Sequence, residues 1–151
     1  MNHKPEKLKV ILVDDMDDEH VVFKKALSSI EYIQLDLISF KTAEELEEYL
    51  ARPLGNTTHI LFLDLHLTNK GGLECLKKIR TNPSYKQLIV AIYSMESDER
   101  TIRKCLAEGA NIFITKPSEY KLLQQRIQEA LRSCMQFHTM GINFETFVRC
   151  F

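Results

Sequence analysis

Five short apolar segments, each followed by a segment with helical features, constrain the fold of this chain more than any other feature. The apolar segments cover residues 8–13, 33–39, 59–63, 88–93 and 111–115. Two stretches within them, 60–63 and 88–92, are apolar at every position. Such runs are typical of parallel strands covered by helices on both faces. We therefore predict five strands in a sheet that is buried on both sides.

The segments between the strands carry the start and end signals of helices. Thr42 and Glu45 form a capping-box pattern at the start of the second predicted helix, and Gly109 follows the fourth, where glycine commonly ends a helix. The first, third, fourth and fifth predicted helices cover residues 17–30, 72–79, 98–108 and 118–134. This alternation predicts an α/β doubly wound fold, with a five-stranded parallel sheet in the order 2-1-3-4-5 and right-handed crossovers.

Polar residues directly follow four of the five predicted strands. Asp14 and Asp15 follow the first strand and Asp64 the third, while Ser94 follows the fourth and Lys116 the fifth. The carboxyl ends of the strands meet at one edge of a doubly wound sheet, where such folds place their functional residues. We therefore predict that these side chains converge on one site.

The carboxylates of this site would repel one another in one crevice unless a cation lay between them. Mg²⁺ prefers oxygen ligands in octahedral geometry and keeps several waters, so it suits Asp14, Asp15 and Asp64 better than zinc does. Lys116 adds a charge that can neutralise phosphate oxygens, and the Ser94 hydroxyl can donate to another. The residues therefore predict a site for Mg²⁺ and a phosphate group.

This set of residues resembles the pattern of response-regulator receiver domains in order, strand position and spacing. The resemblance covers roughly residues 7–133, and the intervals are similar to those of chemotaxis-type, single-domain two-component response regulators. It implies the flavodoxin-like receiver fold. The residues that carry it are Asp14-Asp15, Asp64, Ser94 and Lys116-Pro117.

The resemblance implies a phosphorelay function centred on Asp64. This residue would be the phosphoacceptor, taking a phosphoryl group from a phosphohistidine on a histidine kinase or histidine phosphotransfer protein, with the help of Lys116. Mg²⁺ would be held by Asp14, Asp15, Asp64 and the backbone carbonyl of His66. A receiver catalyses its own phosphorylation and slow dephosphorylation, and is not a turnover enzyme.

The resemblance also implies how the signal leaves the site. Ser94 would assist transfer and then move toward the phosphoryl group, and Phe113, at the position of the family's aromatic switch residue, would turn inward. The face built from the fourth helix, fifth strand and fifth helix would be remodelled and would signal by contact with a downstream protein. A cis bond would precede Pro117.

Three other functions compete with the phosphorelay function. A flavin or nucleotide binder of this fold needs a phosphate-binding loop after the first strand, where this chain has the acidic run 14–19. A hydrolase with an aspartate nucleophile usually has D-x-D there, whereas Asp14 and Asp15 are adjacent. A receiver-like interaction module that works without phosphorylation is the main alternative, although the complete set of site residues argues against it.

Composition disfavours several classes of partner. With 20 Lys and Arg against 21 Asp and Glu, the net charge is -1, and direct nucleic-acid binding lacks the basic field it needs. No run approaches the length of a membrane span, and no signal-peptide core is found. The 4 cysteines are spaced unlike zinc ligands, so we expect reduced thiols and a cytoplasmic location.

Residues 135–151 extend past the receiver domain, which we place at 7–134. Phe144, Phe147, Val148 and Phe151 follow helical spacing, and Asn143 could cap that helix. So apolar an extension is expected to dock, either on its own domain or on a partner. If the extension docks on a partner, that partner could be a second copy of the chain in a homodimer.

Overall fold

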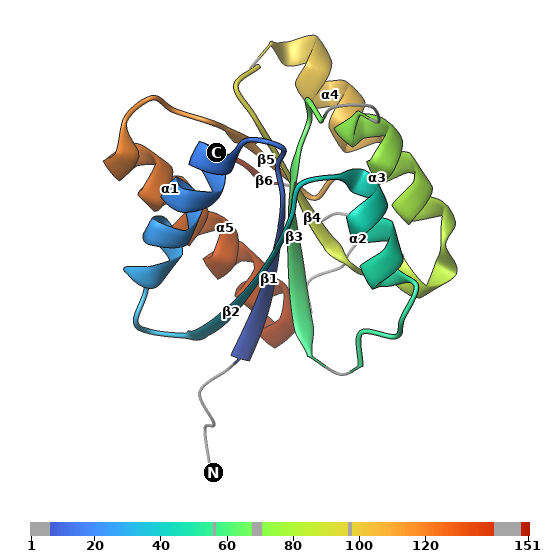
Figure 1. The fold of residues 1–151 in the computed structure, drawn as a ribbon, viewed down its shortest axis with the longest axis horizontal. Helices are drawn as coiled ribbons and strands as arrows, with labels where there is room; N and C mark the ends of the chain where they lie inside the picture. The colour runs from blue at the N-terminus through green and yellow to red at the C-terminus, as the bar shows by residue number, and fades with distance from the viewer. Residues whose placement is uncertain (1–6, 56, 68–70, 97, 141–148) are drawn as a thin grey trace.

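The computed structural model describes residues 7–55, 57–67, 71–96, 98–140 and 149–151, which form a parallel sheet between two layers of helices (Figure 1). All strand pairs are parallel, in the order β2-β1-β3-β4-β5-β6. The doubly wound sheet with the order 2-1-3-4-5 is therefore confirmed, and a sixth strand extends it. The strands are β1 (Lys7–Val13), β2 (Gln34–Phe40), β3 (Thr58–Asp64), β4 (Ile89–Ser94), β5 (Ile112–Thr115) and β6 (Arg149–Cys150).

The helices cover both faces of the sheet and create two apolar cores. One core lies under α1 and α5 and contains Phe23, Phe62 and Tyr93, while the other lies under α2, α3 and α4 and contains Leu63 and Phe113 (Figure 1). Successive residues of a strand point to opposite faces, so an all-apolar strand feeds both cores. The helices are α1 (Asp17–Ser28), α2 (Ala43–Leu50), α3 (Gly72–Thr81), α4 (Glu99–Ala107) and α5 (Tyr120–Met140), with a 3-10 turn η1 (Pro83–Tyr85).

Local capping fixes where α2 and α4 begin. The backbone N–H of Glu45 donates to the Thr42 hydroxyl oxygen at 3.1 Å, so the predicted cap of α2 is confirmed. At the start of α4, the Asp98 carboxylate accepts from the Thr101 N–H at 3.0 Å. Gly109 follows α4 with a φ of 109°, a conformation that favours glycine. Among the described residues, no helix is long and apolar enough to cross a membrane.

The C-terminal residues differ from the prediction. Helix α5 continues to Met140 rather than ending at residue 134, so the first part of the predicted extension belongs to this helix. Residues 141–148, which include the predicted cap Asn143, lie outside the described residues. Arg149 and Cys150 form a strand, so the helix predicted from the spacing of residues 144–151 is wrong at its C-terminal end.

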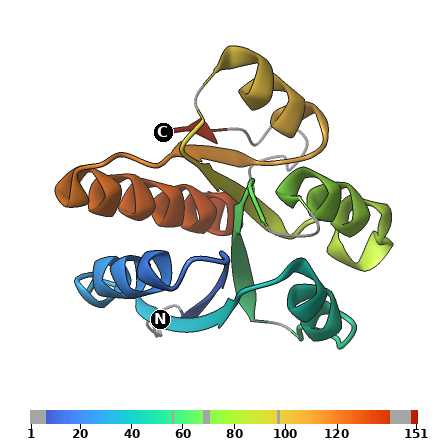
Figure 2. The same cartoon turned by 45° about the horizontal axis from the view of Figure 1, so that its top comes forward.

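Strand β6 forms because the outer edge of β5 offers unpaired backbone groups. The Phe151 N–H donates to the Phe113 carbonyl at 2.9 Å, and the Thr115 N–H donates to the Phe151 carbonyl at 3.0 Å. The Phe151 side chain also packs against the core under α1 and α5. Figure 2 shows β6 beside β5, on the edge of the sheet away from β4. Backbone pairing at this edge outweighs the local helical spacing.

A close backbone approach at Gly72 holds the end of β3 in place. The Gly72 N–H donates to the Leu65 carbonyl at 2.9 Å. A Cβ atom at Gly72 would lie 2.1 Å from the Asp64 carbonyl oxygen and 2.8 Å from the Leu65 Cα. Both are backbone atoms, so a larger residue would have to displace the end of the strand that carries Asp64.

We predict that Gly72→Ala lowers the free energy of unfolding by about 1–3 kcal/mol, because the added methyl group overpacks the backbone at Asp64. Urea denaturation measures the change. Gly71→Ala is the matched control, since Gly71 has a φ of -62° and its Cβ would meet no atom within 4 Å. It should stay within about 0.5 kcal/mol of wild type. Equal losses at the two positions would contradict this account of Gly72.

Deleting residues 149–151 tests the pairing of β6. We expect amide hydrogen exchange at Thr115 to accelerate by about tenfold, because its N–H loses the Phe151 carbonyl as acceptor. NMR exchange of the 151-residue chain and of the shortened chain measures this. The neighbouring Lys116 N–H donates to the Ser94 carbonyl at 2.7 Å and should keep its protection. Unchanged exchange at Thr115 would contradict the pairing.

Candidate functional site

Asp14, Asp15 and Asp64 meet at the carboxyl ends of β1 and β3. These strands are neighbours in parallel register, and Val13 pairs with Leu63, so the residues that follow them share one edge. One carboxylate oxygen from each aspartate lies within 4.8 Å of the others. Ligands on opposite sides of a Mg²⁺ ion are about 4.2 Å apart, so the three oxygens suit a small divalent ion. The predicted acidic cluster is therefore present and can hold a divalent ion.

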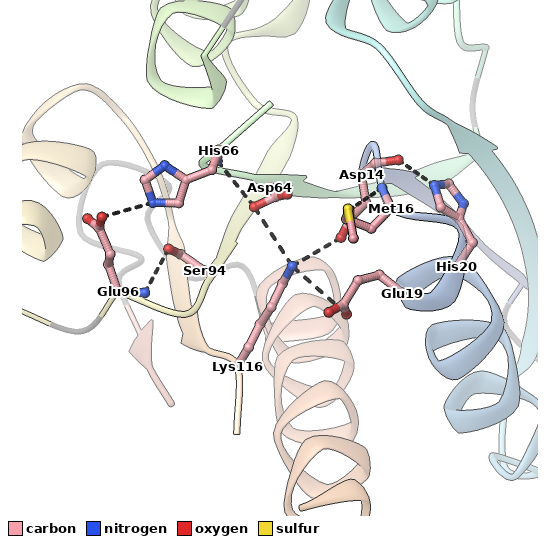
Figure 3. A network of polar contacts seen from close by, with 9 residues as sticks. All are labelled: Asp14, Met16, Glu19, His20, Asp64, His66, Ser94, Glu96 and Lys116. Carbon is pink, nitrogen blue, oxygen red and sulfur yellow. Dashed lines mark hydrogen bonds and ion pairs between the residues drawn. The ribbon is translucent and has the colours of Figure 1, made fainter. Parts of the chain in front are cut away.

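Lys116 is the cation of this cluster. Its Nζ atom lies 3.0 Å from Asp14 Oδ2, 3.8 Å from Asp64 Oδ1 and 3.9 Å from Glu19 Oε2 (Figure 3). The Lys116 side chain is only 9% exposed, so water screens these interactions weakly. Its backbone is fixed by the N–H that donates to the Ser94 carbonyl at 2.7 Å.

Glu19 belongs to the site, although the sequence alone shows it only as part of the acidic run 14–19. Glu19 lies in the first turn of α1 and points toward the Lys116 ammonium (Figure 3). The neighbouring Asp17 instead pairs with Lys41 at 2.6 Å. A helix-start pattern does not distinguish these acids, because only the placement of α1 decides which of them faces the site.

Ser94 and His66 line the other side of the site. Ser94 is fully buried, and its hydroxyl oxygen accepts from the Glu96 N–H at 3.1 Å. The backbone N–H of His66 donates to Asp64 Oδ1 at 3.2 Å, and its imidazole lies 3.1 Å from the Glu96 carboxylate (Figure 3). The loops after β3 and β4 are thus joined next to Asp64. The metal-binding role of the His66 carbonyl stays a prediction.

The structure bears differently on the predictions made for Phe113 and for Pro117. Phe113 is already buried in the core under α2, α3 and α4, with 1% of its surface exposed, and its movement stays a prediction. The bond before Pro117 is trans, so the implied cis bond is wrong for this structure. The Lys116 ammonium contacts Asp14 with the trans bond in place.

The charges of the site favour the binding of a cation. Burial raises the pKa of Asp64, and the negative charges of Asp14 and Asp15 act in the same direction. The Lys116 ammonium and the His66 N–H lower this pKa, but they offset only part of the effect. The ionised form of Asp64 is therefore less favoured in the folded chain than in water, and a divalent ion would offset this cost.

Comparison with known sequences gives one consistent family. The family model described as response regulator receiver domain matches residues 10–128. The chain is 30% identical over 108 residues to the two-component response regulator ORR3 of Oryza sativa subsp. japonica, covering 72% of this chain and 79% of that protein. It is 24% identical to the chemotaxis protein CheY1 of Helicobacter pylori, covering 82% and 97%. It is also 27% identical to the osmosensing histidine protein kinase SLN1 of Saccharomyces cerevisiae, covering 81% and 10%.

Solved structures show the same fold. The phosphorylated cyanobacterial phytochrome response regulator RcpA superposes with a TM-score of 0.70 at 22% identity, covering 89% of this chain and 95% of that chain. The Mn²⁺-bound form of response regulator Rcp1 gives a TM-score of 0.70 at 22% identity, covering 89% and 96%.

We predict that Asp64→Asn raises the free energy of unfolding by about 1–2 kcal/mol at pH 7 in metal-free buffer, because it removes a buried charge from a repulsive cluster. A pKa raised by folding means that the folded chain favours the protonated carboxyl. Wild type should therefore regain stability as the pH falls, and the difference should narrow. Thermal or urea unfolding at several pH values measures this effect.

Asp18→Asn is the matched control for this measurement. Asp18 is exposed on α1 and lies outside the cluster, so its substitution should leave the stability within about 0.5 kcal/mol of wild type. A less stable Asp64→Asn variant at pH 7 would show that the local contacts of Asp64 outweigh the repulsion.

Proposed function

The chain belongs to the response-regulator receiver family, and from this premise we propose that it accepts a phosphoryl group on Asp64 from a phosphohistidine. Receivers interact with histidine kinases or phosphotransfer proteins and are not turnover enzymes. The observation that carries the proposal is the buried Asp64 carboxylate, which clusters with the carboxylates of Asp14 and Asp15 and lies 3.8 Å from the Lys116 ammonium.

In the proposed transfer, an Asp64 oxygen attacks the phosphorus as the bond from phosphorus to the donor imidazole nitrogen breaks. The product is an acyl phosphate on Asp64 and a free histidine on the donor. Lys116, 3.8 Å from the Asp64 carboxylate, would neutralise a phosphoryl oxygen, and the Ser94 hydroxyl would donate to another. Transfer of this kind needs positioning and charge neutralisation more than covalent help from the protein.

We assign Mg²⁺ to the acidic cluster, with Asp14, Asp15, Asp64 and the His66 carbonyl as its ligands. Bound there, the ion would neutralise the charge of the transferred group. Two observations support a hard divalent ion, namely the all-oxygen donor set of the cluster and the Mn²⁺ held by the similar response regulator Rcp1. Desolvation of the Asp64 carboxylate by burial, together with repulsion from Asp14 and Asp15, gives the ion a favourable electrostatic role.

The proposed output is a change of the surface formed by α4, β5 and α5, which would contact a downstream protein. Ser94 ends β4 and accepts from the Lys116 N–H through its carbonyl, so the site and β5 are directly linked. Phe113 lies on β5 and would move with Ser94 as the switch. The similarity to a segment of a histidine kinase supports a phosphorelay partner. The cysteines of the described residues form no disulfide, which supports the cytoplasm as the location.

Incubation with Mg²⁺ and a phosphorylated histidine kinase tests this function. We expect wild type to gain one phosphoryl group in intact-mass measurement and Asp64→Asn to gain none, because the nucleophile is lost. Chelation of the metal should abolish the gain. Asp36→Asn is the matched control, since Asp36 pairs with Lys9 at 3.5 Å outside the cluster, and it should be phosphorylated like wild type.

A wild-type chain that gains no phosphoryl group from a kinase that phosphorylates another receiver would contradict this function. That result would favour the alternative, an interaction module that works without phosphorylation. If Asp64→Asn gains as much phosphoryl group as wild type, the phosphoacceptor is a residue other than Asp64.

A further inference from the structure

Tyr93, the residue before Ser94 on β4, forms an aromatic surface under the Lys116 ammonium. The Lys116 Nζ atom lies 4.3 Å from the centroid of the Tyr93 ring. Tyr93 is 1% exposed, so little water reaches this contact. A cation over an aromatic face is attracted by the ring quadrupole, and the attraction is larger where water is excluded. The ring is therefore a contact of Lys116 in addition to its carboxylates.

The neighbouring aromatic residues hold this ring in a fixed place. Phe23, from α1, meets Tyr93 edge to face, with the ring centroids 5.9 Å apart and an interplanar angle of 73°. Phe23 also meets Phe62, from β3, at 4.9 Å and 67°. Edge-to-face pairs prefer a defined geometry, and tightly packed cores leave little room for a ring to shift. The position of Tyr93 is thus set by three elements of the fold.

Such a fixed surface matters because the carboxylates alone do not select one position for Lys116. Asp14 lies nearest, while Asp64 and Glu19 lie at nearly equal distances of 3.8 and 3.9 Å from the ammonium. Figure 3 shows the ammonium between these acids, with Glu19 on the α1 side. A lysine side chain is long and flexible, so the acids permit several orientations. The ring restricts them, because the ammonium must stay over its face.

We propose that Tyr93 is a positioning residue for Lys116, whose ring holds the ammonium where it faces the phosphoryl group on Asp64. This inference rests on the proposed function of Asp64. Tyr93 acts through Lys116 and needs no contact with the phosphoryl group or the metal.

The ring, and not the hydroxyl, carries this role. The Tyr93 hydroxyl has no hydrogen-bond partner among the described residues. Burial raises the pKa of the phenol far above its ordinary value, and Glu19, Asp14 and Asp64 add to the effect, so the group stays neutral. An unpaired buried hydroxyl costs stability. Phenylalanine at this position should therefore keep the role of the ring, whereas an aliphatic residue should lose it.

The first measurement detects the contact itself and needs no phosphorylation. In the full chain, ring current from Tyr93 should shift the Lys116 Hε protons upfield in the NMR spectrum, because they lie over the ring face. We expect Tyr93→Phe to keep this shift and Tyr93→Leu to lose it. Retention of the shift in Tyr93→Leu would overturn the contact.

The second measurement is the rate of phosphorylation from a phosphorylated kinase with Mg²⁺. We expect Tyr93→Leu to be about tenfold slower than wild type, which corresponds to about 1.4 kcal/mol and lies in the range of a desolvated cation–π contact. Tyr93→Phe should restore the rate to within about threefold. If Tyr93→Leu does not fold, Tyr93→Met, which is nearer in shape to the core side chains, replaces it.

Tyr85→Leu is the control for loss of a buried ring. Tyr85 is buried in the other core, under α2, α3 and α4, so its truncation should destabilise the chain while keeping the Lys116 shift and the rate. Equal slowing by Tyr85→Leu and Tyr93→Leu would reduce Tyr93 to a structural residue. A wild-type chain that shows the upfield shift but is not phosphorylated would overturn the proposed function instead.

Discussion

The close approach of Asp14, Asp15 and Asp64, which the sheet enforces against their mutual repulsion, is the constraint on which the site depends. Three carboxylates with oxygens within 4.8 Å of one another are unfavourable, and burial makes them more so. The fold imposes this arrangement through strands that are buried on both faces and cannot shift in register without exposing a core. The stability of the apolar sheet therefore holds the acids together, and this enforced proximity is what would let the site hold a divalent ion.

Lys116 offsets the effect of burial and of the neighbouring carboxylates on Asp64 only in part, so the remaining negative charge could still attract a divalent ion. A fixed positive charge that fully neutralised the aspartates would weaken metal binding. The surroundings of Lys116 combine charged and uncharged contacts, since Asp14 and Asp64 attract the ammonium and the Tyr93 ring lies beneath it. A neutral aromatic surface can fix a cation without adding another negative charge to the cluster.

The sequence predicted the sheet and the acidic cluster because both depend on patterns along single segments. Apolar runs such as 60–63 identify buried strands, and a parallel sheet gathers whatever follows them at one edge. Glu19 and Tyr93 could not be identified in this way. The role of Glu19 depends on how α1 packs against the sheet, and the role of Tyr93 depends on which face of β4 lies toward Lys116. Neither fact can be read from an acid in the first turn of a helix or from a tyrosine in an apolar strand. Spacing around Phe151 predicted a helix, whereas the open edge of β5 determined a strand.

Strand β5 connects the site with the edge of the sheet. It is only 4 residues long, yet its backbone is paired on both sides, with β4 on the inner edge and with β6 on the outer edge. Lys116 comes directly after it, and Phe113 lies within it. The Thr115 N–H is bonded outward to Phe151, while the Lys116 N–H is bonded inward to Ser94. The backbone that carries the site's cation is therefore fixed by bonds to both neighbours, so a change at either edge of β5 acts on the same short strand.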